Sequence, residues 1–163
     1  MSDRTYTRFS IPLSVLADKA MTEAIRIAFG FSVQDFQSTV LSDPVPDEAA
    51  GHDSFAVRLI DGRPFLVYEE SDCNYGGSSI EDELCAAHVP FIQVNGAGHD
   101  FGPTSTAYDG ETSEVIRLGH DLEPIAGIGL LAGKVAVDPG EIADFERYLR
   151  QRQAVLLYPA LAA

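Results

Sequence analysis

The sequence predicts an α+β fold: a single domain, residues 1–163, with a mixed or mainly antiparallel sheet of about five to six strands and about four helices packed on it. Helical patterns cluster toward both ends of the chain, whereas strand patterns fill its middle. An Asp-Gly pair separates two β-rich runs, which is typical of a tight hairpin. The chain of 163 residues is 45% hydrophobic, enough for one sizeable core. We expect the helices to cover one face of the sheet.

The N-terminal segment predicts a strand followed by two helices. Residues 6–11 alternate as in a strand. Apolar residues then repeat at helical spacing over residues 15–29, with Ser14 as the N-cap and Gly30 as the residue after the helix. Residues 32–35 carry a capping-box pattern, Ser-x-x-Asp, which predicts that a second helix begins there.

The clearest local prediction is a hairpin. Residues 54–60 and 63–70 are β-rich, and Asp61 and Gly62 between them suit the positive φ angles of a type I′ turn. A two-residue loop fixes the register, pairing Ile60 with Arg63, Val57 with Leu66 and Phe55 with Tyr68. Pro64 cannot donate a backbone hydrogen bond, so we expect it to face outward or lie at an edge.

The middle of the chain predicts a β-β-α-β unit followed by a long loop. A helix over residues 80–87 and a strand over residues 89–95 continue the hairpin. We consider a parallel pairing of this strand with the second strand of the hairpin, although the crossover between them is short. Residues 96–110 are punctuated by Gly and Pro and predict a loop. Further strands are expected at residues 114–118 and 134–137.

The last predicted element is a helix that begins at the Asp-Pro-Gly-Glu of residues 138–141, with Asp as N-cap and Pro in the first turn. Its apolar stripe follows helical spacing through Ile142, Phe145, Leu149, Arg152 and Leu156. Three arginines occupy its second half, namely Arg147, Arg150 and Arg152. We interpret them as favourable to the helix dipole rather than as phosphate ligands.

Charge is distributed unevenly along the chain. The sequence has 25 acidic and 11 basic residues and a formal charge of −14. Residues 64–116 contain ten carboxylates and neither Lys nor Arg. Such a block repels nucleic acid and anions and attracts a basic protein partner, unless it serves solubility alone. Six of these carboxylates fall at predicted strand ends and in loops and are the candidate partner-binding residues: Glu69, Glu70, Asp72, Asp100, Asp109 and Glu111.

Three His-Asp pairs supply the other candidate chemistry. They are His52-Asp53, His99-Asp100 and His120-Asp121, all in predicted loops. Imidazole and carboxylate together bind divalent transition metals or carry out acid–base catalysis. Neighbouring side chains on an extended chain point apart, so a site needs two of the loops to converge. The candidate metal ligands are His99, Asp100, His120 and Asp121.

Other classes of function are disfavoured. The Gly-rich segments match neither a P-loop nor the dinucleotide fingerprint, and no EF-hand spacing occurs, so no cofactor is expected. No apolar run reaches membrane-spanning length and the start lacks a signal core, so we expect a cytoplasmic protein with both cysteines reduced. The leading hypothesis is a non-enzymatic inhibitor of a basic nucleic-acid-binding protein or nuclease, as in immunity or counter-defence proteins. The alternative is a small hydrolase, with or without a metal, that uses the His-Asp loops.

Overall fold

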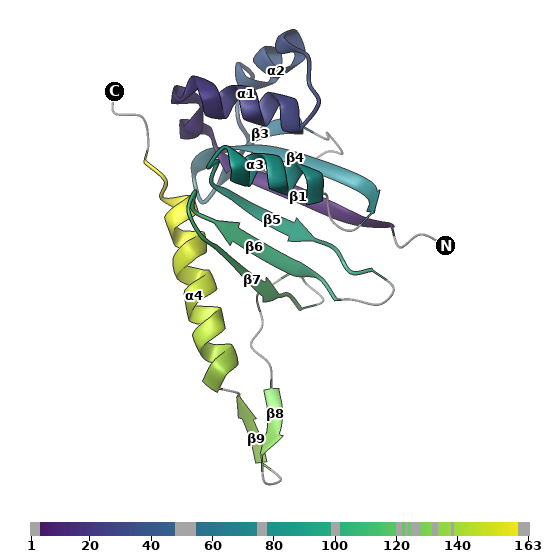
Figure 1. The fold of residues 1–163 in the computed structure, drawn as a ribbon, viewed down its shortest axis with the longest axis vertical. Helices are drawn as coiled ribbons and strands as arrows, with labels where there is room; N and C mark the ends of the chain where they lie inside the picture. Colours follow the sequence, from purple (N-terminus) through teal and green to yellow (C-terminus); the bar gives the residue numbers. More distant parts are fainter. Residues whose placement is uncertain are drawn as a thin grey trace.

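Seven strands form the central sheet of the computed structural model, in the spatial order β2-β3-β4-β1-β5-β6-β7 (Figure 1). The structure describes residues 4–47, 55–74, 78–98, 102–119, 122, 124, 128–131, 134–137 and 139–159. The strands are β1 (Arg4–Pro12), β2 (Val45–Pro46), β3 (Phe55–Ile60), β4 (Arg63–Asn74), β5 (Phe91–Asn95), β6 (Thr104–Tyr108) and β7 (Ser113–Arg117). Within these residues, β2 and β3 pair in parallel and the other neighbours are antiparallel. The predicted α+β fold with a mixed sheet is confirmed.

Four α-helices and one short 3₁₀ helix are found in the described residues. They are η1 (Leu13–Ala17), α1 (Lys19–Ala28), α2 (Val33–Val40), α3 (Ser78–Ala86) and α4 (Pro139–Leu156). Among the strands that the structure describes, β8 (Ile128–Leu131) and β9 (Lys134–Val137) pair with each other alone. This second hairpin and the first half of α4 extend beyond the edge of the sheet (Figure 1).

Helices cover both faces of the sheet, so the expectation of one covered face is wrong. Between the sheet and α1, α2 and α3 lies the larger core, which includes buried Phe9, Ile25 and Leu84. A second core on the opposite face joins Ala107 of β6 to Tyr148 of α4. Because alternate residues of a strand point to opposite faces, one strand can contribute to both sides, as β6 does with Tyr108 in the first core and Ala107 in the second.

The reason for two covered faces can be found in β4. Three consecutive residues, Phe65, Leu66 and Val67, are each at most 1% exposed. Leu66 belongs to the core under α1–α3, whereas Phe65 and Val67 pack with Val155 of α4. A continuous apolar run of this kind is typical of a strand that is buried on both sides.

The hairpin formed by β3 and β4 has the predicted register, with the three expected residue pairs in place. Asp61 and Gly62 have φ angles of 50° and 73°, as a type I′ turn requires. Pro64 is exposed and lies beyond the end of β1, whose last pair is Pro12 with Phe65. The hairpin predictions are therefore confirmed.

The position of β1 differs from the expected arrangement. This N-terminal strand pairs antiparallel with both β4 and β5 and lies between them. β4 and β5 consequently run in the same direction but do not pair, so the parallel pairing considered for the β-β-α-β unit is wrong. Helix α3 connects β4 to β5 across β1 (Figure 1).

The first helix begins later than its periodicity indicates. Residues 13–17 form η1, and α1 starts at Lys19 because the Asp18 carboxylate accepts hydrogen bonds from the N–H groups of Ala20 and Met21. Asp18, not Ser14, is therefore the N-cap of the α-helix. Gly30 has a φ of 71° and ends α1 in a Schellman arrangement, as its position predicts.

The remaining elements agree in part with the predictions. Ser32 caps α2 as predicted, since its hydroxyl accepts a hydrogen bond from the Asp35 N–H at 3.1 Å. The predicted loop over residues 96–110 is wrong in part, because residues 104–108 form β6, with Thr and Tyr on one face and Ser and Ala on the other. Flanking Gly and Pro hide this alternation. β9 and the start of α4 are as predicted, whereas β8 was missed.

Candidate ligand-binding pocket

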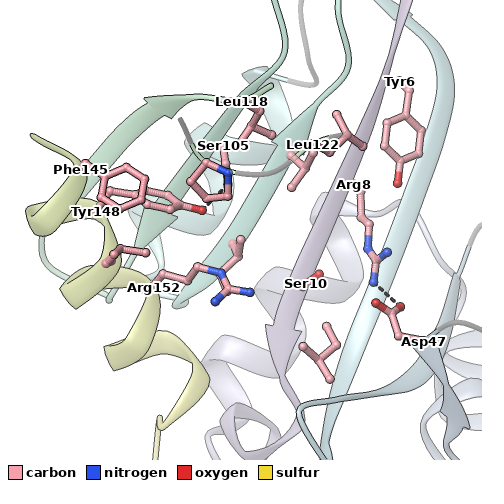
Figure 2. Close-up of a pocket in the computed structure, with 15 residues that line it drawn as sticks. Tyr6, Arg8, Ser10, Asp47, Ser105, Leu118, Leu122, Phe145, Tyr148 and Arg152 are labelled. Carbon is pink, nitrogen blue, oxygen red and sulfur yellow. Dashed lines mark hydrogen bonds and ion pairs between the residues drawn. The ribbon is translucent and has the colours of Figure 1, made fainter. Parts of the chain in front are cut away.

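A cavity of about 460 Å³ lies between the sheet and α4, on the face opposite α1–α3 (Figure 2). Strands β1 and β5 contribute its floor, α4 contributes one wall, and residues after β7 also line it. Its apolar lining comes mainly from Ile60, Ile92, Val94, Leu118, Phe145 and Leu149. Volumes of a few hundred Å³ with mostly apolar walls are typical of small-molecule sites.

Arg152 is the cationic group of the α4 wall. Its half-buried side chain points into the cavity (Figure 2). Among the described residues it forms no ion pair or hydrogen bond. Arg147, on the same helix, instead bonds to Glu114 at 3.2 Å and to Asp144. As far as the described residues are concerned, Arg152 is therefore a guanidinium available to a ligand.

The opposite wall carries a compact charged cluster on β1, β4 and the residue after β2. Arg8 on β1 forms an ion pair with Asp47 at 2.5 Å and a longer one with Glu69 at 3.7 Å. The Tyr6 hydroxyl donates a hydrogen bond to Glu69 at 3.3 Å. Burial, followed by the nearby Glu69 charge, raises the pKa of Tyr6 to about 12, so its hydroxyl stays protonated at neutral pH. One cation faces two anions here, which gives this cluster a net charge of −1.

A buried hydrogen-bond chain holds α4 against the sheet beside the cavity. The Ser105 hydroxyl donates to the Gln93 carbonyl at 3.0 Å, so the Tyr148 hydroxyl, 2.7 Å from Ser105, must be the donor of that pair. Tyr148 is 2% exposed, and burial raises the pKa of its phenol. The wall that bears Arg152 is therefore fixed by packing and by hydrogen bonding.

The predicted partner-binding residues are separated by the fold. Glu69 belongs to the charged cluster, half-buried, while Glu70 points to the other face of β4 and has interactions of its own. Asp72 lies near the end of β4, where the structure describes its backbone alone. Asp100 lies outside the described residues.

Asp109 and Glu111 lie in the turn between β6 and β7, at the opposite end of the sheet. Glu70 shares a register row with Thr104, four residues before Tyr108, and three strand steps separate β4 from β6. Strand spacing and rise put the two groups about 20 Å apart. The Asp109 carboxylate also accepts hydrogen bonds from the N–H groups of Glu111 and Thr112, each at 2.9 Å. Asp109 therefore shapes the turn, and the described candidates do not form one patch.

The metal candidates His99, Asp100, His120 and Asp121 lie outside the described residues, as do His52 and Asp53. Within the residues that are described, no group of three or more His, Cys, Asp or Glu side chains is placed to hold a metal ion. The hydrolase alternative depends on the undescribed pairs and stays a prediction.

The remaining His and the described Cys have local roles. His88 Nδ1 lies 2.8 Å from the Gly110 carbonyl and ties the end of α3 to the β6–β7 turn. Cys85 is a free thiol whose pKa is raised by burial and by the charges of Glu81 and Asp82. A raised pKa opposes thiolate formation, so Cys85 is a poor nucleophile at neutral pH.

The pocket was missed from the sequence, although one signal was present. Arg152 occupies a position of the apolar stripe of α4, where a charge signals a special environment. The assignment of the arginines to the helix dipole is wrong, because the last turn of α4 contains no basic residue and the dipole effect is confined to that turn. Arg8 and Tyr6 gave no comparable signal, because only the sheet brings them opposite α4.

Two further observations bear on the identity of the protein. In the part of the chain that is described, no helix has both the length and the apolar character needed to cross a bilayer. Comparison with known proteins gives no match: no family model fits the chain, and no curated protein or solved structure is significantly similar to it.

Proposed function

We propose that the protein binds a small organic molecule with a single carboxylate group, which pairs with Arg152, and an apolar body that packs against the walls of the cavity. The observation that carries this proposal is a half-buried guanidinium without a partner among the described residues, directed into an apolar cavity. Arginine presents a fork of N–H donors that matches the two oxygens of a carboxylate. The pocket supplies both elements of amphipathic recognition.

Charge favours a ligand with one anionic group over a ligand with two or more. The whole chain carries a formal charge of −14, and the opposite wall of the cavity has a net charge of −1. Each additional negative charge on a ligand would meet this field without a second unpaired cation among the described lining residues. A carboxylate with an apolar body therefore suits the site better than a phosphate.

The test compares two arginines of the same helix. Arg152→Gln removes the group that is proposed to bind the carboxylate. Arg150→Gln removes an exposed charge from a residue outside the cavity lining. A charge-assisted hydrogen bond is worth about 1.5–3 kcal/mol, so Arg152→Gln should weaken binding about 10- to 100-fold. Arg150→Gln should leave binding nearly unchanged.

The probe is octanoate, titrated by calorimetry and used in competition with 1-anilinonaphthalene-8-sulfonate. Binding of octanoate to the wild type and the Arg150→Gln variant, with loss in Arg152→Gln, supports the proposal. Equal affinity in all three proteins, or no binding to the wild type of octanoate or of a panel of aliphatic and aromatic carboxylates, would overturn it.

A basic protein partner is the second candidate, now with different residues. Asp82 and Glu83 on α3 and Glu111 in the β6–β7 turn are exposed and have no cationic partner among the described residues. Contacts of Tyr108 and His88 hold the end of α3 against this turn. Exposed carboxylates of this kind steer a basic partner in a salt-dependent way.

Charge reversal of Asp82, Glu83 and Glu111 tests this second candidate. A basic protein captured by the wild type at low salt should be lost at high salt and should not be captured by the variant. Reversal of Glu70, at the opposite end of the sheet from the β6–β7 turn, is the comparison. Unchanged capture by the triple variant would identify the acidic block as a solubility feature.

A further inference from the structure

The cavity is electrically polar across its width. Arg152 contributes one positive charge on the α4 side. On the β1 side, Arg8, Asp47 and Glu69 together contribute a net charge of −1. Figure 2 shows Arg8 and Asp47 joined on one side of the space and Arg152 reaching in from the other. A ligand with a single charged end would use only half of this arrangement.

Arg8 is poorly suited to receive a second anion. Its guanidinium already has carboxylate oxygens of Asp47 and Glu69 within 4 Å, at 2.5 Å and 3.7 Å. An anion that approached Arg8 would be repelled by both carboxylates. The β1 side therefore disfavours a dianion and favours a positively charged group.

The same cluster retains acceptor capacity. Asp47 uses its Oδ1 atom for Arg8, and its Oδ2 atom has no partner among the described residues. Glu69 uses Oε1 for both Tyr6 and Arg8, and no described residue bonds to its Oε2 atom. Asp47 lines the cavity directly and is 34% exposed at its side chain, so an ammonium group can reach it.

We propose that the ligand is a zwitterion of the amino-acid class, with its carboxylate on Arg152, its ammonium group on Asp47 and an apolar segment between them. This inference rests on the proposed function and adds a second subsite to it. The floor between the two ends is formed by Ile92 and Val94 of β5 with Ser10 of β1. An apolar linker between the charged groups fits that surface.

Matched pairs of ligands test the second subsite. The probes are 4-aminobutanoate, 6-aminohexanoate and 8-aminooctanoate, each compared by calorimetry with the alkanoate of the same chain length that lacks the amine. Without a cation subsite, the amino acid should bind less tightly than the matched alkanoate, because an ammonium group is harder to desolvate than a methyl group. The amino acid should nevertheless bind at least about fivefold more tightly at one or more lengths. The best length measures the separation of the two subsites.

Variants at the two ends of the cavity should give different binding patterns. Arg152→Gln should weaken both members of a pair, because both carry the carboxylate. Asp47→Asn should remove the advantage of the amino acid and strengthen the plain alkanoate, since it makes the cluster with Arg8 neutral overall. Glu69→Gln should reduce the same advantage and serves as a second variant should Asp47→Asn unfold the segment after β2. Circular dichroism and denaturant titration confirm that each variant is folded.

The outcomes separate the two proposals. If the alkanoates bind at least as tightly as the amino acids at every length and Arg152→Gln weakens them, the zwitterion is refuted while the carboxylate site stands. If no probe binds the wild type, both proposals fail. A preference for the amino acids that persists in both Asp47→Asn and Glu69→Gln would place the cation subsite elsewhere and overturn this assignment.

Discussion

Gly62→Val should destabilise the protein by about 2 kcal/mol, through the backbone alone. Gly62 has a φ of 73°, and a Cβ atom built on it meets no atom within 4 Å. The substitution therefore causes no clash, and its cost is that of holding a β-branched residue in the left-handed region, about 1–3 kcal/mol. Unfolding entropy of about 2.1 cal/mol/K per residue, for a chain of 163 residues, converts the midpoint of this range into a fall in Tm of about 6 °C.

Differential scanning calorimetry measures this effect against two matched variants. Gly102→Val also places its side chain in open space, but at a φ outside the left-handed region, so its Tm should stay close to that of the wild type. Gly62→Asn should also cost little, because Asn tolerates the left-handed conformation. The reasoning would be refuted by an unchanged Tm in Gly62→Val or by equal losses at both glycine positions.

Three further predictions concern titrating groups. Ultraviolet difference titration of the wild type against Tyr6→Phe should place the Tyr6 pKa near 12, and Glu69→Gln should lower it; an ordinary pKa near 10 would contradict the buried cluster. Burial raises the pKa of Glu81 above its usual 4.5, so the folded state holds the carboxyl proton more tightly than the unfolded state. The free energy of unfolding therefore falls as the pH rises from about 4.5 through the raised pKa. Denaturant titrations across this range should show that Glu81→Gln removes this fall in the free energy of unfolding. If the free energies of unfolding of the wild type and the variant differ by the same amount at every pH, the prediction is contradicted. Thiol titration of the unfolded, unreduced protein should count two thiols, Cys73 and Cys85, and a count of zero would show a disulfide. Cys85 should be alkylated more slowly in the native state than in the unfolded state, because its pKa is raised in the fold.

Features governed by neighbouring residues could be predicted from the sequence. The hairpin register follows from a two-residue turn, and the N-cap of α2 depends on two residues that are three positions apart. Gly30 ends α1 because its own φ is positive. The N-cap of α1 shows the limit of such reasoning. The sequence offers both Ser14 and Asp18, and in the structure the Asp18 carboxylate accepts hydrogen bonds from two N–H groups.

Features created by distant contacts could not be predicted in the same way. The central position of β1 and the cover provided by α4 depend on pairing between segments far apart in the chain. The cavity exists only because these elements meet, so Arg8 and Arg152 face it from residues more than 140 positions apart. The acidic block was visible in composition, but its carboxylates are distributed over both ends of the sheet and partly used in internal contacts.

The central position of β1 has a consequence for the order of events during synthesis. Strand β1 leaves the ribosome before the other strands of this sheet and finds its partners only when residues 65–74 and then 92–95 have emerged. Until then its apolar side chains have no sheet to join, and contacts of such long sequence separation are slow to form. Because β1 alone connects β2-β3-β4 to β5-β6-β7 in the sheet, its second edge stays unpaired after β4 has joined it, until residues 92–95 emerge. Shielding of the N-terminal strand by a chaperone should therefore affect the yield of folded protein more than shielding of any later segment of the sheet.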